Sequence, residues 1–122
     1  MAGPCIAVVD DDESVRESLP ELLKEMGYSA RAFASAKEFL AAFSTQRSDC
    51  LILDVAMPEM SGPELQRELA RQGHRVPIIF ITAQSDRGVR SALLQQGAVE
   101  CLFKPFSEQQ LQSALGAALS GL

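Results

Sequence analysis

Apolar residues in this chain gather in short runs, and longer amphipathic segments separate the runs. Four strong runs lie at 5–9, 51–53, 78–81 and 101–103, and a weaker, alternating run lies at 28–33. All of them are too short for helices, and the four strong runs are too uniformly apolar for a sheet with one face open to water. The pattern therefore predicts buried parallel strands.

The segments that follow the runs have apolar residues three or four positions apart, which is typical of helices that pack one face on a sheet. These positions are Val15, Leu19, Leu22, Leu23, Met26; Phe39, Leu40, Phe43; Leu65, Leu69; Val89, Leu93, Leu94; and Leu111, Ala114, Leu115, Ala118, Leu119. Gly27, Gly73 and Gly97 each precede a strand, as expected where a helix ends in a left-handed residue. Ser35 and Glu38 have the spacing of a capping box.

Two prolines bear on the helices. Pro63 stands near the start of the third helical segment, where proline is common. Pro20 lies inside the first segment, where its ring and its missing N–H are expected to bend the helix. No linker or repeat interrupts the five β-then-α units, so we expect residues 1–122 to form one α/β domain. Right-handed crossovers then place helices on both faces of the sheet.

Composition narrows the classes of function. The net charge is −5 and no stretch is dense in Lys and Arg, so direct contact with nucleic acid is not expected. The apolar runs are far below the roughly 18 residues of a membrane span, and the start of the chain lacks the features of an export signal. We therefore expect a cytoplasmic protein without membrane contact.

Cysteine and histidine give no sign of a metal site. Cys5, Cys50 and Cys101 lack paired spacing and lie in or beside apolar runs. Reduced core thiols fit this pattern better than zinc or a disulfide. His74 stands alone in a polar segment and is expected to be an exposed loop residue.

Polar side chains follow four of the predicted strands. Asp10 and Asp11 follow the first run, and Asp54, Thr82 and Lys104 follow the runs at 51–53, 78–81 and 101–103. The carboxyl ends of parallel strands share one edge of a sheet, where such folds bind ligands. These side chains are therefore expected to form a cluster.

The charge of this cluster points to phosphate chemistry. Three carboxylates repel one another or take up protons unless a cation intervenes, and Lys104 supplies only one positive charge. A divalent ion would balance the rest, and oxygen ligands favour Mg²⁺, which prefers a site shared with a phosphate. Thr82 could donate its hydroxyl to a phosphoryl oxygen, which leaves Asp54 as the plausible nucleophile.

Each member of the cluster also has a simpler interpretation. Asp10 and Asp11 could merely favour a helix N-terminus, and Asp12 is expected to be the N-cap of the first helix. Lys104 before a proline could be a turn residue, and Thr82 could be a strand terminator. The signal is therefore the whole constellation rather than any one residue.

Four stretches carry these residues in a joint spacing that is highly specific. They are VVDDDESVRESL, LILDVAMPEMSGPEL, PIIFITA and GAVECLFKPF. Together they resemble the motifs of response-regulator receiver domains, the CheY-like phosphoacceptors of two-component signalling, from about residue 6 to about residue 120. The resemblance implies a flavodoxin-like, doubly wound fold with five helices and five parallel strands in the order 2-1-3-4-5. It also implies a regulatory domain, not an enzyme, that assists its own phosphoryl transfer and dephosphorylation.

The resemblance also assigns roles around the acceptor. A histidine kinase would pass a phosphoryl group from its phosphohistidine to Asp54. Mg²⁺ would be held by Asp11, Asp54 and the backbone carbonyl of Ala56, and Asp10 would reach the metal through water.

On the other side of the acceptor, Thr82, the backbone N–H of Ala83 and Lys104 would hold the phosphoryl group. The Lys104-Pro105 bond would be cis. If Thr82 moves toward the new oxygens, the loop and helix beyond it should shift as well, so residues 84–110 would present the surface that an output domain or target protein reads.

Three positions depart from the family pattern. Ala56 and Gln84 stand two residues after the acceptor and after the threonine, where relatives carry side chains that control water access to the acyl phosphate. The sequence therefore does not predict the lifetime of the acyl phosphate. Cys101 stands where the family usually has an aromatic switch residue, so the switch involves either Thr82 alone or a substitute ring from Phe103 or Phe106.

Other classes fit less well. A haloacid-dehalogenase-like phosphatase needs a second aspartate where this chain has Ala56, and a nucleotide-binding domain needs a glycine-rich loop in place of DDDES. The motifs are most like those of receivers coupled to a C-terminal helix-turn-helix, so the natural output is expected to be control of transcription. The alternatives are a stand-alone receiver and a degenerate receiver used for docking. The apolar face of the last helix leaves a homodimer possible.

Overall fold

The computed structural model describes residues 3–83 and 87–120, which form one parallel sheet with helices on both faces. The strands are β1 (Cys5–Val9), β2 (Ser29–Phe33), β3 (Cys50–Asp54), β4 (Ile78–Thr82) and β5 (Glu100–Phe103). Every neighbouring pair is parallel, and the order across the sheet is β2-β1-β3-β4-β5. The predicted strands, their order and the flavodoxin-like topology are confirmed, with strand ends moved by a residue at most.

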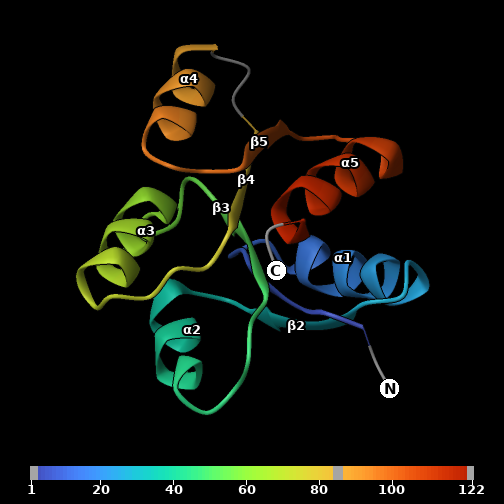
Figure 1. Cartoon of the computed structure of the whole chain (residues 1–122), viewed down its shortest axis with the longest axis horizontal. Coiled ribbons are helices and arrows are strands. Elements are labelled where there is room, and N and C mark those ends of the chain that lie inside the picture. Colours follow the sequence, from blue (N-terminus) through green and yellow to red (C-terminus); the bar gives the residue numbers. More distant parts are fainter. Residues whose placement is uncertain (1–2, 84–86, 121–122) are drawn as a thin grey trace.

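Helices alternate with the strands along the chain. They are α1 (Glu13–Glu25), α2 (Ala36–Phe43), α3 (Gly62–Arg71), α4 (Arg87–Gln95) and α5 (Glu108–Leu119). Figure 1 shows α1 and α5 together on one face of the sheet and α2, α3 and α4 on the other. This arrangement explains why the strands read as continuous apolar runs: both faces are covered.

The core has two halves that the alternation of each strand separates. In β1, Ala7 and Val9 pack with the buried faces of α2, α3 and α4, whereas Ile6 and Val8 pack with α1 and α5. The central strands β3 and β4 are buried along their whole length. The edge strand β2 has two exposed residues, which accounts for its weaker apolar pattern.

Short polar side chains begin the helices as expected. Asp12 is the N-cap of α1 and accepts a hydrogen bond from the Ser14 N–H. Ser35 caps α2 by accepting a hydrogen bond from the Glu38 N–H. The Glu38 carboxylate accepts from the Ala34 N–H and not from the Ser35 N–H, so the capping box is only half formed. Pro63 lies in the first turn of α3.

The helix ends are also confirmed. Gly27, Gly73 and Gly97 all have positive φ, between 82° and 106°, where a Cβ would be strained. Helix α1 continues through Pro20, which is buried.

Two of the three cysteines and the histidine take the places expected of them. All three thiols are free, and Cys50 and Cys101 are buried in the core, whereas Cys5 is only partly buried. Burial raises the pKa of Cys50 to about 12, so this thiol stays protonated at neutral pH. His74 is exposed, with its ring 4.5 Å from that of Phe43 between centroids. Within the described residues, no helix combines the length and the apolar character needed to cross a membrane.

Gly62 allows α3 to begin directly against the end of β3. Its N–H donates to the Val55 carbonyl at 2.9 Å. A Cβ on Gly62 would collide with the backbone carbonyl oxygen of Asp54 and crowd the ring of Phe80. Glycine at position 62 therefore allows the backbone of α3 to approach the end of β3, where Asp54 lies, without a steric clash.

Replacing Gly62 by alanine should lower the free energy of unfolding by about 1–3 kcal/mol, because the backbone must shift to admit the methyl group. Urea denaturation would measure the change. Gly116 in α5 is a matched control, because a Cβ there meets nothing within 4 Å. Gly116→Ala should raise stability by about 0.5–1 kcal/mol. Equal stability of Gly62→Ala and the wild type would contradict this account of the α3 start.

Candidate functional site

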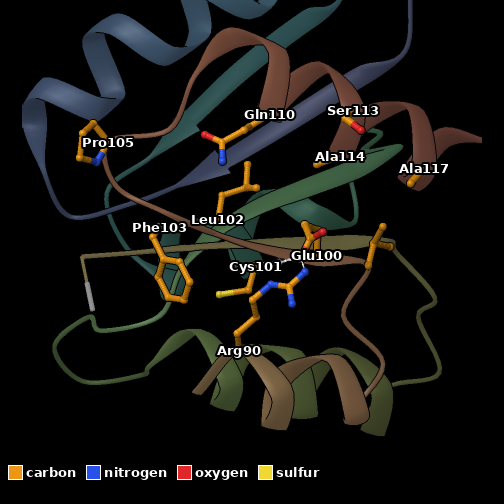
Figure 2. Close-up of a pocket in the computed structure, with 11 residues that line it drawn as sticks. Arg90, Glu100, Cys101, Leu102, Phe103, Pro105, Gln110, Ser113, Ala114 and Ala117 are labelled. Carbon is orange, nitrogen blue, oxygen red and sulfur yellow. Dashed lines mark hydrogen bonds and ion pairs between the residues drawn. The ribbon is translucent and has the colours of Figure 1, made fainter. Parts of the chain in front are cut away.

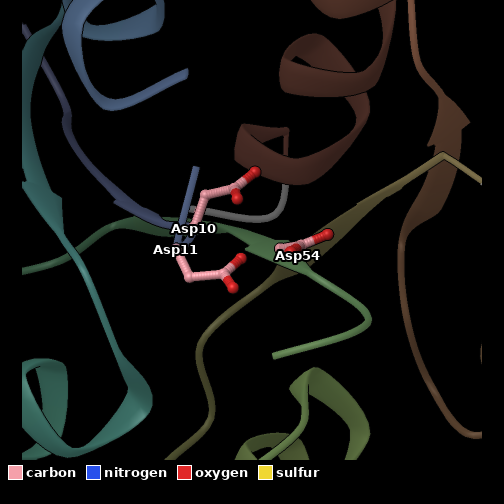
Figure 3. Close-up of side chains that lie close together, drawn as sticks. All are labelled: Asp10, Asp11 and Asp54. Atoms are coloured by element: carbon pink, nitrogen blue, oxygen red, sulfur yellow. The ribbon is translucent and has the colours of Figure 1, made fainter. Parts of the chain in front are cut away.

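Three aspartates meet at the carboxyl edge of the sheet. Asp10 and Asp11 follow β1, and Asp54 ends the adjacent strand β3, whose Leu53 pairs with Val9. One carboxylate oxygen from each aspartate lies within 4.8 Å of the other two (Figure 3). Asp10 and Asp54 are buried, and Asp11 is exposed. The structure thus brings together the acids that the sequence placed at two strand ends.

Lys104, which follows the edge strand β5, also reaches this cluster. Its Nζ lies 2.9 Å from Asp10 Oδ2 and 3.6 Å from Asp54 Oδ1. Its backbone N–H donates to the Thr82 carbonyl at 2.8 Å, which continues the pairing of β4 with β5 beyond the last strand residue. The Lys104-Pro105 bond is cis, as the motif resemblance implied.

Asp10 has a partner for each of its polar groups. Its Oδ2 accepts from Lys104, and its Oδ1 accepts from the Asp12 N–H at 2.9 Å. Its backbone N–H donates to the Phe33 carbonyl, and its own carbonyl accepts from Arg16 Nη1 at 3.0 Å. Such complete pairing is what a fully buried carboxylate requires.

Arg16 could not be predicted as part of this site from the amino-acid sequence. It is one of several charged residues on α1, and nothing in its spacing distinguishes a side chain that turns back onto the loop from one that points to solvent.

The cluster carries more negative charge than Lys104 can balance. Three ionised carboxylates and one ammonium sum to −2 (−3 and +1). Burial, followed by the neighbouring Asp10 carboxylate, raises the pKa of Asp54 to about 7, although Lys104 acts in the opposite direction. Burial disfavours the charged form of Lys104, yet its hydrogen bond to Asp10 and the nearby Asp54 carboxylate raise the pKa of the ammonium group. The site therefore favours an additional cation, either protons or a metal ion.

Thr82, Ala83 and Ala56 lie at the same edge of the sheet. Thr82 ends β4, is 2% exposed, and stands between the strand ends that carry Asp54 and Lys104. Ala83 follows it and is exposed. Ala56 is exposed in the loop after β3. Gln84 lies outside the described residues.

Cys101 lies apart from the acidic cluster. It is in the middle of β5, is buried, and packs in the half of the core that α2, α3 and α4 cover. It lines a cavity of about 460 Å³ over β5, between α4 and α5 (Figure 2). Arg90 of α4 and Glu100 of β5 both line this cavity and form an ion pair at 2.6 Å, and the Glu100 carboxylate also accepts from the Cys101 N–H. Phe103 lines the same cavity, so a ring is present on β5 two residues from the cysteine.

Comparison with known proteins identifies the family. The sequence model of the response regulator receiver domain matches residues 6–116. The chain belongs to this family. The receiver is 43% identical over 114 residues to the response regulator protein TodT of Pseudomonas putida, covering 93% of this chain and 50% of TodT. It is 41% identical over 115 residues to the transcriptional regulatory protein TdiR of Thauera aromatica, covering 94% of this chain and 51% of TdiR. The chain thus spans about half the length of these curated relatives.

Solved receiver structures have the same fold. The crystal structure of FixJ-N matches with a TM-score of 0.89 and 34% identity, covering 100% of this chain and 98% of that one. A response regulator receiver protein from Burkholderia phymatum matches with a TM-score of 0.84 and 44% identity, covering 97% and 96% of the two chains. The chain is therefore a regulatory receiver domain of two-component response regulators, and its acidic cluster could hold a metal ion.

Replacing Asp54 by asparagine should stabilise the metal-free receiver, because it removes one of three clustered charges and keeps the size of the side chain. We expect a gain of about 1 kcal/mol, or roughly 4 °C in the unfolding midpoint. Thermal denaturation in EDTA would measure it.

Asp49 provides the contrast, since it is a buried carboxylate with cationic and N–H partners. It accepts from the Cys5 N–H at 2.8 Å and from Arg47 Nε at 2.9 Å. Asp49→Asn should therefore lower the midpoint. A lower midpoint for Asp54→Asn as well would show that charge crowding does not destabilise the cluster.

Proposed function

We propose that this receiver accepts a phosphoryl group on Asp54 from the phosphohistidine of a histidine kinase, with Mg²⁺ bound at the acidic cluster. The observation that carries the proposal is the position of the Asp54 carboxylate. It is buried at a strand end, 3.6 Å from Lys104 Nζ and within 4.8 Å of the Asp10 and Asp11 carboxylates. When Asp54 receives a phosphoryl group, the added negative charge must be offset by cations. Lys104 provides one, and the carboxylate oxygens of the cluster are ligands for a second, the metal ion.

Mg²⁺ would be held by Asp11, Asp54 and the backbone carbonyl of Ala56, with Asp10 bound through water. The oxygen donor set fits this ion. Both Asp10 carboxylate oxygens already accept a hydrogen bond, whereas Asp11 is exposed, which supports a direct role for Asp11 and an indirect one for Asp10. When bound, Mg²⁺ neutralises charge on the oxygens of the transferring phosphoryl group.

The protein groups around Asp54 have complementary tasks in the transfer. A carboxylate oxygen of Asp54 attacks phosphorus, the bond from phosphorus to the kinase histidine breaks, and the ring nitrogen keeps the electron pair. The resulting acyl phosphate carries about −2 where the carboxylate carried −1. The Thr82 hydroxyl and the Ala83 N–H donate to the phosphoryl oxygens, and Lys104 pairs with the added charge.

The output follows from the position of Thr82. Its movement toward the phosphoryl oxygens changes the surface of residues 84–110 that an output domain or a target protein reads, and residues 84–86 of this range lie outside the described residues. We propose that residues 1–122 are a single receiver domain that controls transcription through a DNA-binding domain. The name of TdiR and the half-length match support this role. A stand-alone receiver and a homodimer are compatible with the same site.

Labelling with a small phosphodonor tests the acceptor. Wild-type protein incubated with acetyl phosphate and Mg²⁺ should gain one phosphoryl group by intact-mass analysis, and EDTA should abolish the gain. Asp54→Asn should remain unlabelled because its amide is not a nucleophile.

Asp49→Asn is the matched control, because Asp49 is buried near the start of β3, at the opposite end of the strand from Asp54. It should be labelled as the wild type is. Labelling of Asp54→Asn at the wild-type level would rule out Asp54 as the acceptor. Failure of the wild type to be labelled would favour a degenerate receiver used for docking.

Metal binding can be tested without phosphorylation. Mg²⁺ at about 100 times its dissociation constant should stabilise the wild type by about 2.7 kcal/mol, measured as a rise in the unfolding midpoint. Asp11→Asn should lose most of this rise. Glu13→Gln, which removes an exposed negative charge three residues from Asp10, should keep it. An equal rise in all three proteins would place the metal elsewhere.

A further inference from the structure

We propose that Arg16 is a positioning residue for the metal site: its hydrogen bond to the Asp10 carbonyl sets the direction of the Asp11 carboxylate. This inference rests on the proposed function, because it assigns Asp11 to the metal. Arg16 Nη1 lies 3.0 Å from the Asp10 carbonyl oxygen, and the contact is partly buried.

The geometry of the peptide bond connects this contact to Asp11. The Asp10 carbonyl group, the Asp11 nitrogen and the Asp11 Cα lie in one plane. A donor that fixes the direction of the Asp10 carbonyl oxygen therefore fixes the position of the Asp11 Cα. From that atom the Asp11 side chain extends toward Asp54 (Figure 3).

Other hydrogen bonds hold the loop on both sides of Asp11. The peptide group between Asp10 and Asp11 is held by Arg16. The Asp12 N–H donates to Asp10 Oδ1, and Asp12 in turn accepts from the N–H and the hydroxyl of Ser14. On the strand side, the Asp10 N–H donates to the Phe33 carbonyl. Of these described contacts, only the Arg16 hydrogen bond acts on the carbonyl between Asp10 and Asp11.

The direction in which the Mg²⁺ affinity changes on replacing Arg16 distinguishes a positioning role from a purely electrostatic one. Arg16 places a positive charge beside the loop that carries Asp10 and Asp11. If charge were its whole role, removing it would make the site more negative and tighten the binding of Mg²⁺. If its role is to position Asp11, removing it weakens binding, on the order of tenfold, as the loss of an outer-shell partner typically does.

Two variants of Arg16 and one control test this. Arg16→Met keeps the apolar stem and removes the donors, and Arg16→Lys keeps the charge and a donor. Lys24→Ala removes a positive charge from the same helix, where Lys24 is exposed and 3.9 Å from Glu21. For each folded protein, the Mg²⁺ dissociation constant is measured by the shift of the unfolding midpoint. Hydrogen exchange of the Asp12 amide is measured in EDTA.

We expect Arg16→Met to bind Mg²⁺ about tenfold more weakly and to exchange the Asp12 amide several-fold faster. Arg16→Lys should recover most of the affinity, and Lys24→Ala should match the wild type. The Mg²⁺ concentration that gives half-maximal labelling by acetyl phosphate should rise for Arg16→Met by a similar factor, about tenfold.

Unchanged or tighter binding by Arg16→Met would overturn the proposal, and so would equally weak binding by Arg16→Lys. If Arg16→Met does not fold, Arg16→Gln, which is uncharged and too short to keep the same reach, takes its place. A loss of about tenfold in Mg²⁺ affinity supports the proposal, and unchanged or tighter binding overturns it. A wild type that binds no Mg²⁺ would instead overturn the proposed function itself, and the role of Arg16 with it.

Discussion

The ion pair between Lys104 and Asp10 joins segments that are 94 residues apart in the chain. One follows β1 and the other follows β5, on either side of the two central strands. Asp10 is fully buried, and a buried carboxylate without a cationic partner would be costly. The ammonium group of Lys104 therefore allows the acidic cluster to exist inside the fold. It also brings a positive charge beside Asp54.

That single pair leaves the cluster short of positive charge, which links stability to function. Burial and the neighbouring Asp10 carboxylate raise the pKa of Asp54 to about 7, and Lys104 opposes this only in part. The same imbalance favours a divalent ion, and under the proposed function this ion and Lys104 would offset the charge that Asp54 gains on phosphorylation. Buried β3 and β4 and the close start of α3 at Gly62 surround the Asp54 backbone, and the segments that follow β1 and β5 bring Asp10, Asp11 and Lys104 to its carboxylate.

The surface proposed for output, residues 84–110, includes α4, β5 and Lys104 of the acidic cluster. The Lys104 N–H also donates to the carbonyl of Thr82, the last residue of β4. The cavity beside Cys101 lies over β5, and the paired Arg90 and Glu100 are among its lining residues. Contacts thus run from Asp54 through Lys104 to Thr82, while position 101 on β5 carries a thiol and no ring.

The five strands, the five helices and the residues at the strand ends could all be predicted from the amino-acid sequence, because both periodicity and capping are local properties. Asp10, Asp54, Thr82 and Lys104 could be predicted as one site because parallel strands all end at the same edge. The partners that these groups take became visible only in the folded chain. The preference of Lys104 for Asp10 over Asp54, the contact of Arg16 with a backbone carbonyl, and the need for glycine at position 62 depend on distances between segments far apart in sequence. No local pattern encodes such distances, since they follow from how the helices and loops pack on the finished sheet.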